Sequence, residues 1–404
     1  MKMSRWRRDL YILWFCSFLI QVGFSLIMPF LPKYLAEIGV QGPAISLWSG
    51  VIFAANFVTM ALVSPFWGAV SDRVGRKPMM LRSTLGMGVI VALMGFARSP
   101  LQLLLLRLLQ GMAAGFPAAA TAYLSGIVPK EEAGRALGML STGNMAGSIL
   151  GPIVGGLLAQ MIGYRPIFFL TGGSCLVAGL IVLLMIREKF EPAAAGEREA
   201  HGAALAVVRQ YPVVLSIALV LFMNMFSVFT AEPIISTYLE ELDAPDAWVS
   251  LLSGLVFSVT GLAQVIISPL VGGLSDRIGS RRIIAAALGG ASAMYLLQGM
   301  ATEVWHMIAL RFVLGLFTGG LMPSANGLIA RTVPREQQGR AFGFTQSAQF
   351  LGNVAGPLVG GALAAVFGPR AVFPVTGVVL LVDLAWVLIG LRESAPAARE
   401  RTVD

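Results

Sequence analysis

Long apolar runs recur from one end of the chain to the other, and they restrict its fold more than any other feature. The first is LYILWFCSFLIQVGFSLIMPF at residues 10–30, and about 20 apolar residues suffice for a helix to cross a bilayer core. Unpaired backbone amides in lipid cost several kcal/mol each, so such segments must be helical. Only 12% of the residues are charged, whereas soluble domains average about 25%. The sequence therefore predicts an all-α membrane protein.

The apolar runs group into twelve predicted spans. They cover roughly 10–30, 47–68, 79–97, 101–124, 135–161, 166–186, 212–237, 249–271, 283–300, 304–328, 340–366 and 371–391. The longest polar interruption lies between the sixth and the seventh span. We therefore predict an N-terminal six-helix bundle at 1–186, a cytoplasmic linker at 187–210 and a C-terminal six-helix bundle at 211–404.

Positive charge is distributed unevenly over the loops. The N-terminus, the C-terminus and the loops after even-numbered spans, together with the first few residues of the spans that follow them, carry 23 of the 29 Lys and Arg residues, and short cytoplasmic loops are enriched in these residues. Both termini are therefore predicted to be cytoplasmic, in a multi-pass protein of the cell (cytoplasmic) membrane. The basic charge follows from this topology and does not indicate nucleic-acid binding. The first run lacks an A-x-A cleavage site, so we interpret it as a retained span rather than a signal peptide.

Residues that could bind a metal or form a disulfide are few and dispersed. Cys16 and Cys175 lie inside apolar segments, and His201 and His306 are isolated. This placement gives neither a disulfide framework nor metal-ligand spacing. The sequence also contains no phosphate-binding loop or nucleophile motif, so neither enzyme activity nor ATP-driven transport is predicted.

A short charged phrase occurs twice, half the chain length apart. GAVSDRVGRK occupies residues 68–77 and GGLSDRIGSR residues 272–281, an offset of 204 that also relates Arg107 to Arg311. Because six is an even number of spans, both copies enter the membrane from the same side and form a parallel repeat. Such repeats hold a substrate site near the middle of the membrane, between halves that rock against each other.

Three further stretches are unusual for membrane spans. RLLQGMAA, at residues 107–114, places an arginine within a span, where it costs about 2.5–3.5 kcal/mol and normally faces a partner or water. Span 5 contains GMLSTGNMAGSILGPIVGG at 138–156, and glycines four residues apart allow a neighbouring helix to pack closely, while its proline bends the helix. Span 1 ends in PFLP at 29–32.

Together these features resemble the major facilitator superfamily, and within it the drug:H+ antiporter family, over the whole chain. The resemblance implies the major facilitator fold, with twelve transmembrane helices in two pseudo-symmetric six-helix bundles. It also implies proton-coupled efflux of amphipathic small molecules by alternating access. Two alternatives stay open: a proton-coupled symporter or exporter of one specific metabolite, and a transporter-like receptor or scaffold.

GAVSDRVGRK is similar to the superfamily's signature between spans 2 and 3, which latches the two halves on the cytoplasmic side. The matching residues are Gly68, Asp72, Arg73, Gly75, Arg76 and Lys77. Gly75 suits a tight turn of positive φ. Gly68 allows a neighbouring helix to approach closely. We expect Asp72 at a helix N-terminus, engaging the start of span 11 near Gly339.

Span 5 matches the antiporter family's glycine and proline pattern, which separates exporters from many uptake symporters. The matching residues are Gly138, Gly147, Gly151, Pro152, Gly155 and Gly156. Span 11 repeats the pattern, so helix packing alone could also explain it. The second copy of the charged loop is less complete, because Asp276 and Arg277 are present but Ser280 replaces an arginine. We expect a weaker second latch.

Three ionisable residues are candidates for proton coupling. Arg107 matches a family motif that is tied to proton coupling. The alternative role for Arg107 is structural, as the centre of a group of hydrogen bonds. Some drug antiporters carry an acid in span 1, where this chain has only Gln21. Glu232 in span 7 is the preferred proton carrier, because apolar surroundings favour a neutral carboxyl group; its alternative is a boundary residue that reaches water. Asp383 in span 12 is the second acid, with a buried structural role as its alternative.

The helices that line the cavity in the family contribute ten candidate substrate contacts. They are Gln21, Phe24, Asn56, Asn144, Met223, Asn224, Phe229, Gln346, Gln349 and Asn353. The chain's 19 Met and 23 Phe residues suit an adaptable apolar site. We expect a hydrophobic or cationic small-molecule substrate, a monomer in the lipid bilayer, and no cofactor or metal, with the proton gradient as the energy source.

Overall fold

The computed structural model describes residues 4–188 and 207–390, and within them all regular structure is helical. The N-terminal half contains α1 (Arg5–Leu26), η1 (Met28–Phe30), α2 (Leu31–Glu37), α3 (Ala44–Val74), α4 (Arg76–Met94), α5 (Pro100–Ala113), α6 (Phe116–Ile127), α7 (Ala133–Ile162) and α8 (Tyr164–Met185). The C-terminal half contains α10 (Pro212–Ala231), η2 (Glu232–Ile234), α11 (Ile235–Glu241), α12 (Val249–Ile278), α13 (Ser280–Gln298), α14 (Val304–Thr318), α15 (Leu321–Thr332), α16 (Arg335–Phe367) and α17 (Pro369–Gly390). The predicted linker lies almost entirely outside the described residues.

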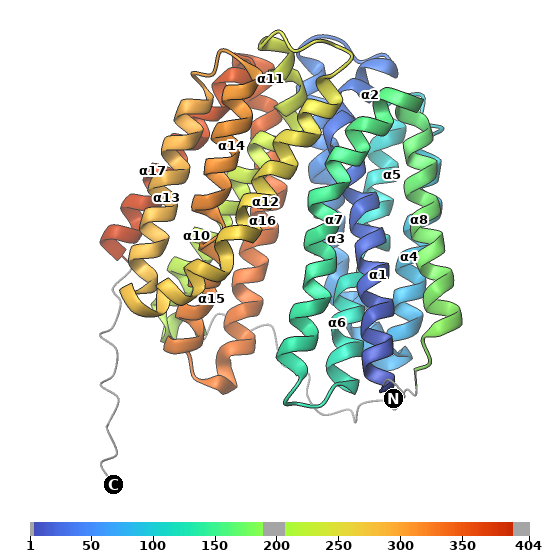
Figure 1. Ribbon diagram of the computed structural model, residues 1–404, viewed down its shortest axis with the longest axis vertical. Helices are drawn as coiled ribbons and strands as arrows, with labels where there is room; N and C mark the ends of the chain where they lie inside the picture. Colours follow the sequence, from blue (N-terminus) through green and yellow to red (C-terminus); the bar gives the residue numbers. More distant parts are fainter. Residues whose placement is uncertain (1–3, 189–206, 391–404) are drawn as a thin grey trace.

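Helices that continue one another form single crossings of the bundle. Ten such segments are long and apolar enough to cross a membrane, and α4 and α13 lie beside them (Figure 1). Both begin with basic pairs, Arg76-Lys77 and Arg281-Arg282, which makes them less apolar. With these two, the described residues form the twelve predicted spans of a multi-pass membrane protein.

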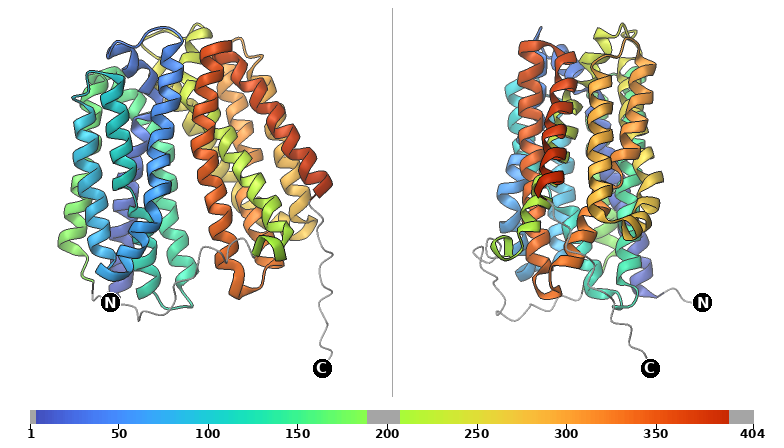
Figure 2. Two further views of the ribbon diagram at one scale, coloured as in Figure 1. Left: turned by 180° about the vertical axis from the view of Figure 1, so that it is seen from behind. Right: turned by 90° about the vertical axis from the view of Figure 1, so that its left-hand side faces the viewer.

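The two six-helix halves lie side by side, close together at one end and apart at the other (Figures 1 and 2). We call the first the closed end, which carries the loops at 38–43 and 242–248. The other is the open end, which carries the turns at Gly75 and Gly279 and the start of α1. The halves therefore diverge toward the open end (Figures 1 and 2).

Glycine-rich faces bring helices into backbone contact within each half. In α7, a Cβ added at Gly155 would lie 2.2 Å from the carbonyl oxygen of Leu26 in α1. In α16, a Cβ added at Gly360 would lie 2.0 Å from the carbonyl oxygen of Thr230 in α10. Any larger residue would have to push the neighbouring backbone away. The spacing thus gives the close packing it predicts in both copies, except that a Cβ at Gly138 would meet nothing within 4 Å.

The same two helices also join the halves near the closed end. Where α12 crosses α7, a Cβ at Gly254 would lie 2.1 Å from the carbonyl oxygen of Pro152. Where α3 crosses α16, a Cβ at Gly50 would lie 2.2 Å from the carbonyl oxygen of Pro357. The proline of each pattern therefore provides a contact point for the opposite half, a role beyond the bend predicted from the sequence.

Spans 4 and 10 are each broken in the middle, although the sequence analysis predicted uninterrupted helices. Gly115, with φ +131°, separates α5 from α6. This φ is accessible mainly to glycine. Pro117 has no backbone N–H, so it cannot donate the hydrogen bond that a continuous helix would need at this position. The corresponding break between α14 and α15 falls at Gly319 and Gly320.

Candidate substrate and proton site

A cavity of about 530 Å³ lies mainly in the N-terminal half and extends toward the open end. We call it the N-half cavity. Gln21, Phe24 and Asn56 line its middle part, and Trp67 and Arg76 line it near the open end. The wall is mostly apolar, so it suits a molecule with a large hydrophobic surface.

Arg82 in α4 secures the break in span 4 on the wall of this cavity. Its guanidinium donates hydrogen bonds to the carbonyl oxygens of Met112 (3.0 Å) and Ala114 (2.8 Å) at the end of α5. It also lies 3.8 Å from the ring centre of Trp67, where cation–π attraction is worth about 0.5–1 kcal/mol or more. Sequence analysis did not single out Arg82, because its partners are carbonyl groups exposed only by the break.

A second cavity, of about 290 Å³, lies between the two halves, and we call it the interface cavity. Gln21, Phe24 and Phe57 line both cavities, which therefore adjoin at α1 and α3. The polar and aromatic residues from the C-terminal half are Asn224, Ser227, Phe229, Glu232, Phe257, Thr260, Gln264, Tyr295, Arg311 and Thr318. The interface cavity is the place where both halves can contact one bound molecule.

Glu232 is the first residue of η2, directly after α10. Its Oε2 atom is buried and has no hydrogen-bond partner. Arg311 is the cation that interacts with it electrostatically, but the two do not form an ion pair within 4.0 Å among the described contacts. An unsatisfied buried polar group costs about 1–3 kcal/mol. Glu232 therefore weakens the fold in this conformation, which is typical of a functional residue.

Arg311 in α14 reaches the same cavity and is only 3% exposed. Its Nε and Nη2 atoms have no hydrogen-bond partner, and its guanidinium carbon lies 5.7 Å from the ring centre of Tyr295. The Tyr295 hydroxyl donates a 3.1 Å hydrogen bond to the carbonyl oxygen of Ser227 in α10. Sequence analysis treated Arg311 only as the repeat partner of Arg107. The sequence feature that could have pointed to Arg311 is that it lies in the same half of the chain as Glu232.

The other two residues predicted for proton coupling line neither cavity. Arg107 is buried and donates a 3.2 Å hydrogen bond to Oε1 of Gln110 on its own helix. Asp383 is 1% exposed, and neither of its carboxylate oxygens has a hydrogen-bond partner. Leu380, one turn earlier in α17, is the residue that reaches the interface cavity. The proposed coupling roles of Arg107 and Asp383 stay predictions.

Five of the ten predicted substrate contacts line the two cavities. They are Gln21, Phe24, Asn56, Asn224 and Phe229. The other five line neither cavity, and they are Asn144, Met223, Gln346, Gln349 and Asn353. From α7 it is Ser148, one turn beyond Asn144, that faces the interface cavity. Contact with substrate stays a prediction for all ten.

The charged loop at the open end is engaged within the N-terminal half. Arg76 forms an ion pair with Asp72 at 2.5 Å. Asp72 lies in the last turn of α3 rather than at the helix N-terminus predicted for it. Instead, Glu188 accepts hydrogen bonds from the backbone N–H groups of Arg76 (2.8 Å) and Lys77 (2.7 Å) at the start of α4. The positive φ predicted at Gly75 is present, at 104°.

The close helix approach expected at Gly68 is absent, because the halves stand apart at the open end. A Cβ added at Gly68 or at Gly339 would meet nothing within 4 Å, and Gly68 faces the N-half cavity instead. Arg73 and Arg277 are exposed, whereas the side chain of Asp276 lies outside the described residues. The latch between Asp72 and span 11 stays a prediction for a conformation closed at this end.

An ion-pair cluster joins the halves at the closed end. Lys33 in α2 contacts Glu240 in α11, and its Nζ lies 3.1 Å from Oδ1 of Asp246 in the following loop. A second pair, Arg165 with Glu37 at 3.1 Å, lies within the N-terminal half. Lys33 therefore adds a charged contact to the glycine crossings that hold this end closed.

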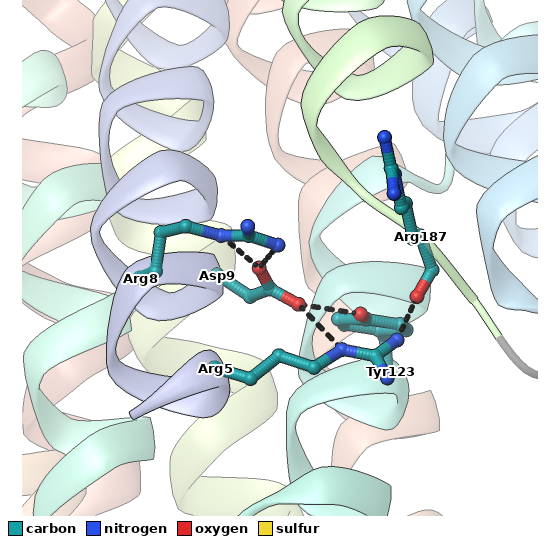
Figure 3. A network of polar contacts seen from close by, with 5 residues as sticks. All are labelled: Arg5, Arg8, Asp9, Tyr123 and Arg187. Carbon is teal, nitrogen blue, oxygen red and sulfur yellow. Dashed lines mark hydrogen bonds and ion pairs between the residues drawn. The ribbon is translucent and has the colours of Figure 1, made fainter. Parts of the chain in front are cut away.

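A buried carboxylate joins three spans at the open end of the N-terminal half (Figure 3). Asp9 in α1 is fully buried and accepts a 2.8 Å hydrogen bond from the hydroxyl of Tyr123 in α6. It also pairs with Arg8 at 2.9 Å and with Arg5 at 3.9 Å. Arg5 donates to the carbonyl oxygen of Arg187, just beyond α8. This network lines neither cavity and links α1, α6 and the end of α8.

The chain is similar to known proteins over nearly its whole length. The profile of the Major Facilitator Superfamily matches residues 13–256 and 217–403. The multidrug resistance protein MdtG of Enterobacter lignolyticus is 39% identical over 394 residues, covering 97% of this chain and 94% of that protein. MdtG of Serratia proteamaculans is 37% identical over 404 residues, covering 100% and 98%.

Solved structures show the same arrangement of helices. A bacterial homolog of the human lysosomal transporter Spinster, in an inward-facing and unoccupied conformation, matches with a TM-score of 0.78 and 15% identity, covering 96% of this chain and 97% of that one. The human organic anion transporter MFSD10 matches with a TM-score of 0.69 and 20% identity, covering 95% and 100%. At these identities the likeness concerns the fold alone.

Two equivalent six-helix halves with a cavity between them define a membrane transporter, not an enzyme. The match to the family profile and the identity to the MdtG proteins then settle its family. The chain belongs to the Major Facilitator Superfamily. This confirms the fold predicted from the sequence.

Proposed function

We propose that the protein is a proton-coupled exporter of amphipathic small molecules in the cytoplasmic membrane, with both termini in the cytoplasm. One observation carries the proposal: the cavity between the halves contains a buried carboxyl group, Glu232, with an unpaired oxygen. A group that must take up and release protons needs access to a cavity and no permanent ion-pair partner. The multidrug resistance name of the MdtG relatives supports the direction of transport.

The lining of the interface cavity supports the substrate class. Phe24, Phe57, Phe229 and Phe257 provide aromatic surface, while Glu232 is the carboxylate in that wall. Aromatic faces and a carboxylate attract amphipathic molecules that are cationic or neutral. We propose no cofactor, because the proton gradient supplies the energy, and we propose that one copy of the chain is sufficient.

The mechanism we propose is alternating access. In the conformation described, the open end faces the cytoplasm and admits substrate into the two adjoining cavities. The halves then rock so that the closed end separates and the open end closes. Glu232 takes up a proton from outside as the substrate leaves, and it releases that proton to the cytoplasm after the halves return.

Dye efflux from a drug-sensitive bacterial host tests the direction and the coupling. Cells that express the protein should accumulate less ethidium and rhodamine than cells carrying an empty vector, and a protonophore should remove the difference. Accumulation above the control, driven by the gradient, would instead identify an uptake symporter.

The role of Glu232 is tested by Glu232→Gln, which keeps the size of the side chain but cannot exchange a proton in the same range. We expect this variant to lose dye efflux driven by a pH gradient. Glu303→Gln, at an exposed position before α14, is the matched control and should transport normally. Intact coupled efflux in Glu232→Gln would exclude this carboxyl group as the proton carrier and leave Asp383 and Arg107 as candidates.

A further inference from the structure

We infer that Arg311, rather than the motif arginine Arg107, is the positioning residue for Glu232, and that its charge sets the pH at which the halves rock. The inference rests on the proposed function of Glu232 and adds a second residue to it. Its basis is the shared cavity, the unpaired atoms on both side chains, and the contrast between the two equivalent arginines.

Arg311 is the cation of the interface cavity. Among the described residues that line it, the titratable side chains are Glu232 from η2, Tyr295 from α13 and Arg311 from α14. The N-terminal half contributes only uncharged residues to the lining, such as Met28 and Ser148. Arg311 is therefore the cation in this lining that acts on Glu232, in addition to the burial of the carboxyl group.

The guanidinium of Arg311 is held in place without being neutralised. It packs near the rings of Tyr295 (5.7 Å) and Phe373 (5.9 Å), while its Nε and Nη2 atoms have no hydrogen-bond partner. A buried cation normally finds a carboxylate or carbonyl partner. The free donors of Arg311 and the free Oε2 of Glu232 thus lie in one cavity without an ion pair, an arrangement from which a pair can form and break.

Arg107 has a different environment at the equivalent position. Its Nη1 donates to Gln110, its Nε is buried without a partner like that of Arg311, and, unlike Arg311, it lines neither cavity. The repeat offset places Met28 where Glu232 stands and Val91 where Tyr295 stands. The positions equivalent to Glu232 and Tyr295 therefore carry no ionisable residue in the N-terminal half, although the family motif falls on Arg107.

The consequence is a charge-dependent contact between α14 and the end of α10. When Glu232 is ionised, Arg311 attracts it toward α14; when Glu232 takes up a proton, that attraction is lost. Tyr295, which donates a hydrogen bond from α13 to Ser227 in α10, keeps α13 and α10 in register during the change. Arg311 thus converts the protonation of Glu232 into a displacement of span 7, whose helix packs directly on α16.

The distance between the halves provides a test that needs no substrate. Lys130, between α6 and α7, and Pro334, between α15 and α16, are exposed and equivalent positions at the open end. Spin labels on cysteines at these sites, in a background without Cys16 and Cys175, report the separation in nanodiscs over a series of pH values. The proposed function predicts that this separation changes with a single pH midpoint.

Arg311→Gln removes the cation, and Arg311→Met does so with an apolar side chain that should fold in a buried site. Because an adjacent positive charge favours the ionised carboxylate, its loss should move the midpoint upward by about one pH unit. Arg311→Lys should keep the wild-type midpoint, and Arg107→Gln, the matched control, should not move it. An unchanged midpoint in Arg311→Gln and Arg311→Met, or an equal shift in Arg107→Gln, overturns the inference.

The Glu232→Gln background separates failure of the inference from failure of the proposed function. If Arg311 acts through Glu232, Arg311→Gln should have no further effect on the separation in that background. A shift of equal size in both backgrounds would show that Arg311 acts elsewhere, while Glu232 could remain the carrier. If the wild-type separation does not respond to pH, or if Glu232→Gln responds like wild type, the proposed function fails and the inference falls with it.

Discussion

The two halves repeat the same helix scaffold, including the buried arginines Arg107 and Arg311, but place their buried carboxyl groups at different positions. In the C-terminal half, Glu232 and Arg311 lie at the interface cavity. In the N-terminal half, the buried carboxylate is Asp9, at the open end and away from both cavities. Duplication thus explains the packing of each half and its buried arginine, whereas the buried carboxyl groups are specific to each half.

The contrast is visible position by position. The repeat offset places Val213 opposite Asp9 and Gly327 opposite Tyr123, so the C-terminal half lacks the network of Figure 3. Conversely, Met28 stands opposite Glu232. One half carries a buried carboxylate that joins three spans, and the other carries a carboxyl group that lines the interface cavity.

The largest effect on stability is expected at the glycine contacts that both halves contain. Gly360→Val and its counterpart Gly155→Val should each cost about 1–3 kcal/mol or more, because the added atoms overlap a neighbouring backbone. Detergent-solubilised protein should then give little monodisperse material on size exclusion. Gly343→Val and Gly138→Val, at positions where a Cβ meets nothing within 4 Å, are the controls. If these controls lose as much protein, the backbone contact is not the cause.

Tyr123→Phe tests the network that only the N-terminal half contains. Removing the hydroxyl deletes a hydrogen bond to a buried carboxylate, worth about 1.5–3 kcal/mol. The thermal unfolding midpoint of the purified protein should fall, while Tyr11→Phe, at a half-exposed tyrosine, should change it little. Equal stability of the two variants would show that Asp9 is satisfied by its arginines alone.

Asp383→Val tests a carboxyl group that only the C-terminal half contains, opposite Ala178 in the repeat. Both oxygens are buried without partners, and an unsatisfied polar group costs about 1–3 kcal/mol. The variant should therefore unfold at a higher temperature and keep proton-coupled efflux. Asp383→Asn, which stays polar, should give a smaller gain. Loss of coupling in both variants would instead assign the proton to Asp383.

The smallest effect is expected at the ion-pair cluster that joins the halves. Lys33→Ala should favour separation of the closed end by only about 0.2–1 kcal/mol, because partly exposed ion pairs are weak. The spin-label separation at the open end should shift slightly toward the closed distance. The exchange Lys33→Glu with Glu240→Lys should restore the wild-type distribution. No difference between wild type and Lys33→Ala would show that the ion-pair cluster adds nothing measurable to the contact between the halves.

Most of the fold was predictable because its causes are local in the sequence. Apolar length predicts spans, the offset of 204 predicts two halves, and glycine spacing predicts packing faces. The breaks in spans 4 and 10 were missed, although Gly115 and Pro117 were available as a signal. The reason is that the same apolar composition continues on both sides of each break.

The site was only partly predictable, because facing directions depend on distant helices. Glu232 was singled out for its rarity in a span, but the sequence does not say that Arg311 shares its cavity while Arg107 does not. Likewise, the capping of α4 by Glu188 joins residues more than a hundred positions apart. Such pairings become visible only when the helices are placed side by side.

The glycine crossings between the halves have a kinetic consequence. At Gly50 and Gly254 the halves touch through backbone atoms, and no side-chain rotamers interlock at these two points. Contacts of this kind, between a Cα–H and a carbonyl oxygen, are worth about 0.5–1 kcal/mol each. In the alternating-access mechanism proposed above, the halves can therefore move past each other at these two points without repacking of side chains, and the contacts that must rearrange lie elsewhere, as between the Phe57 and Phe229 rings, whose centres are 4.9 Å apart.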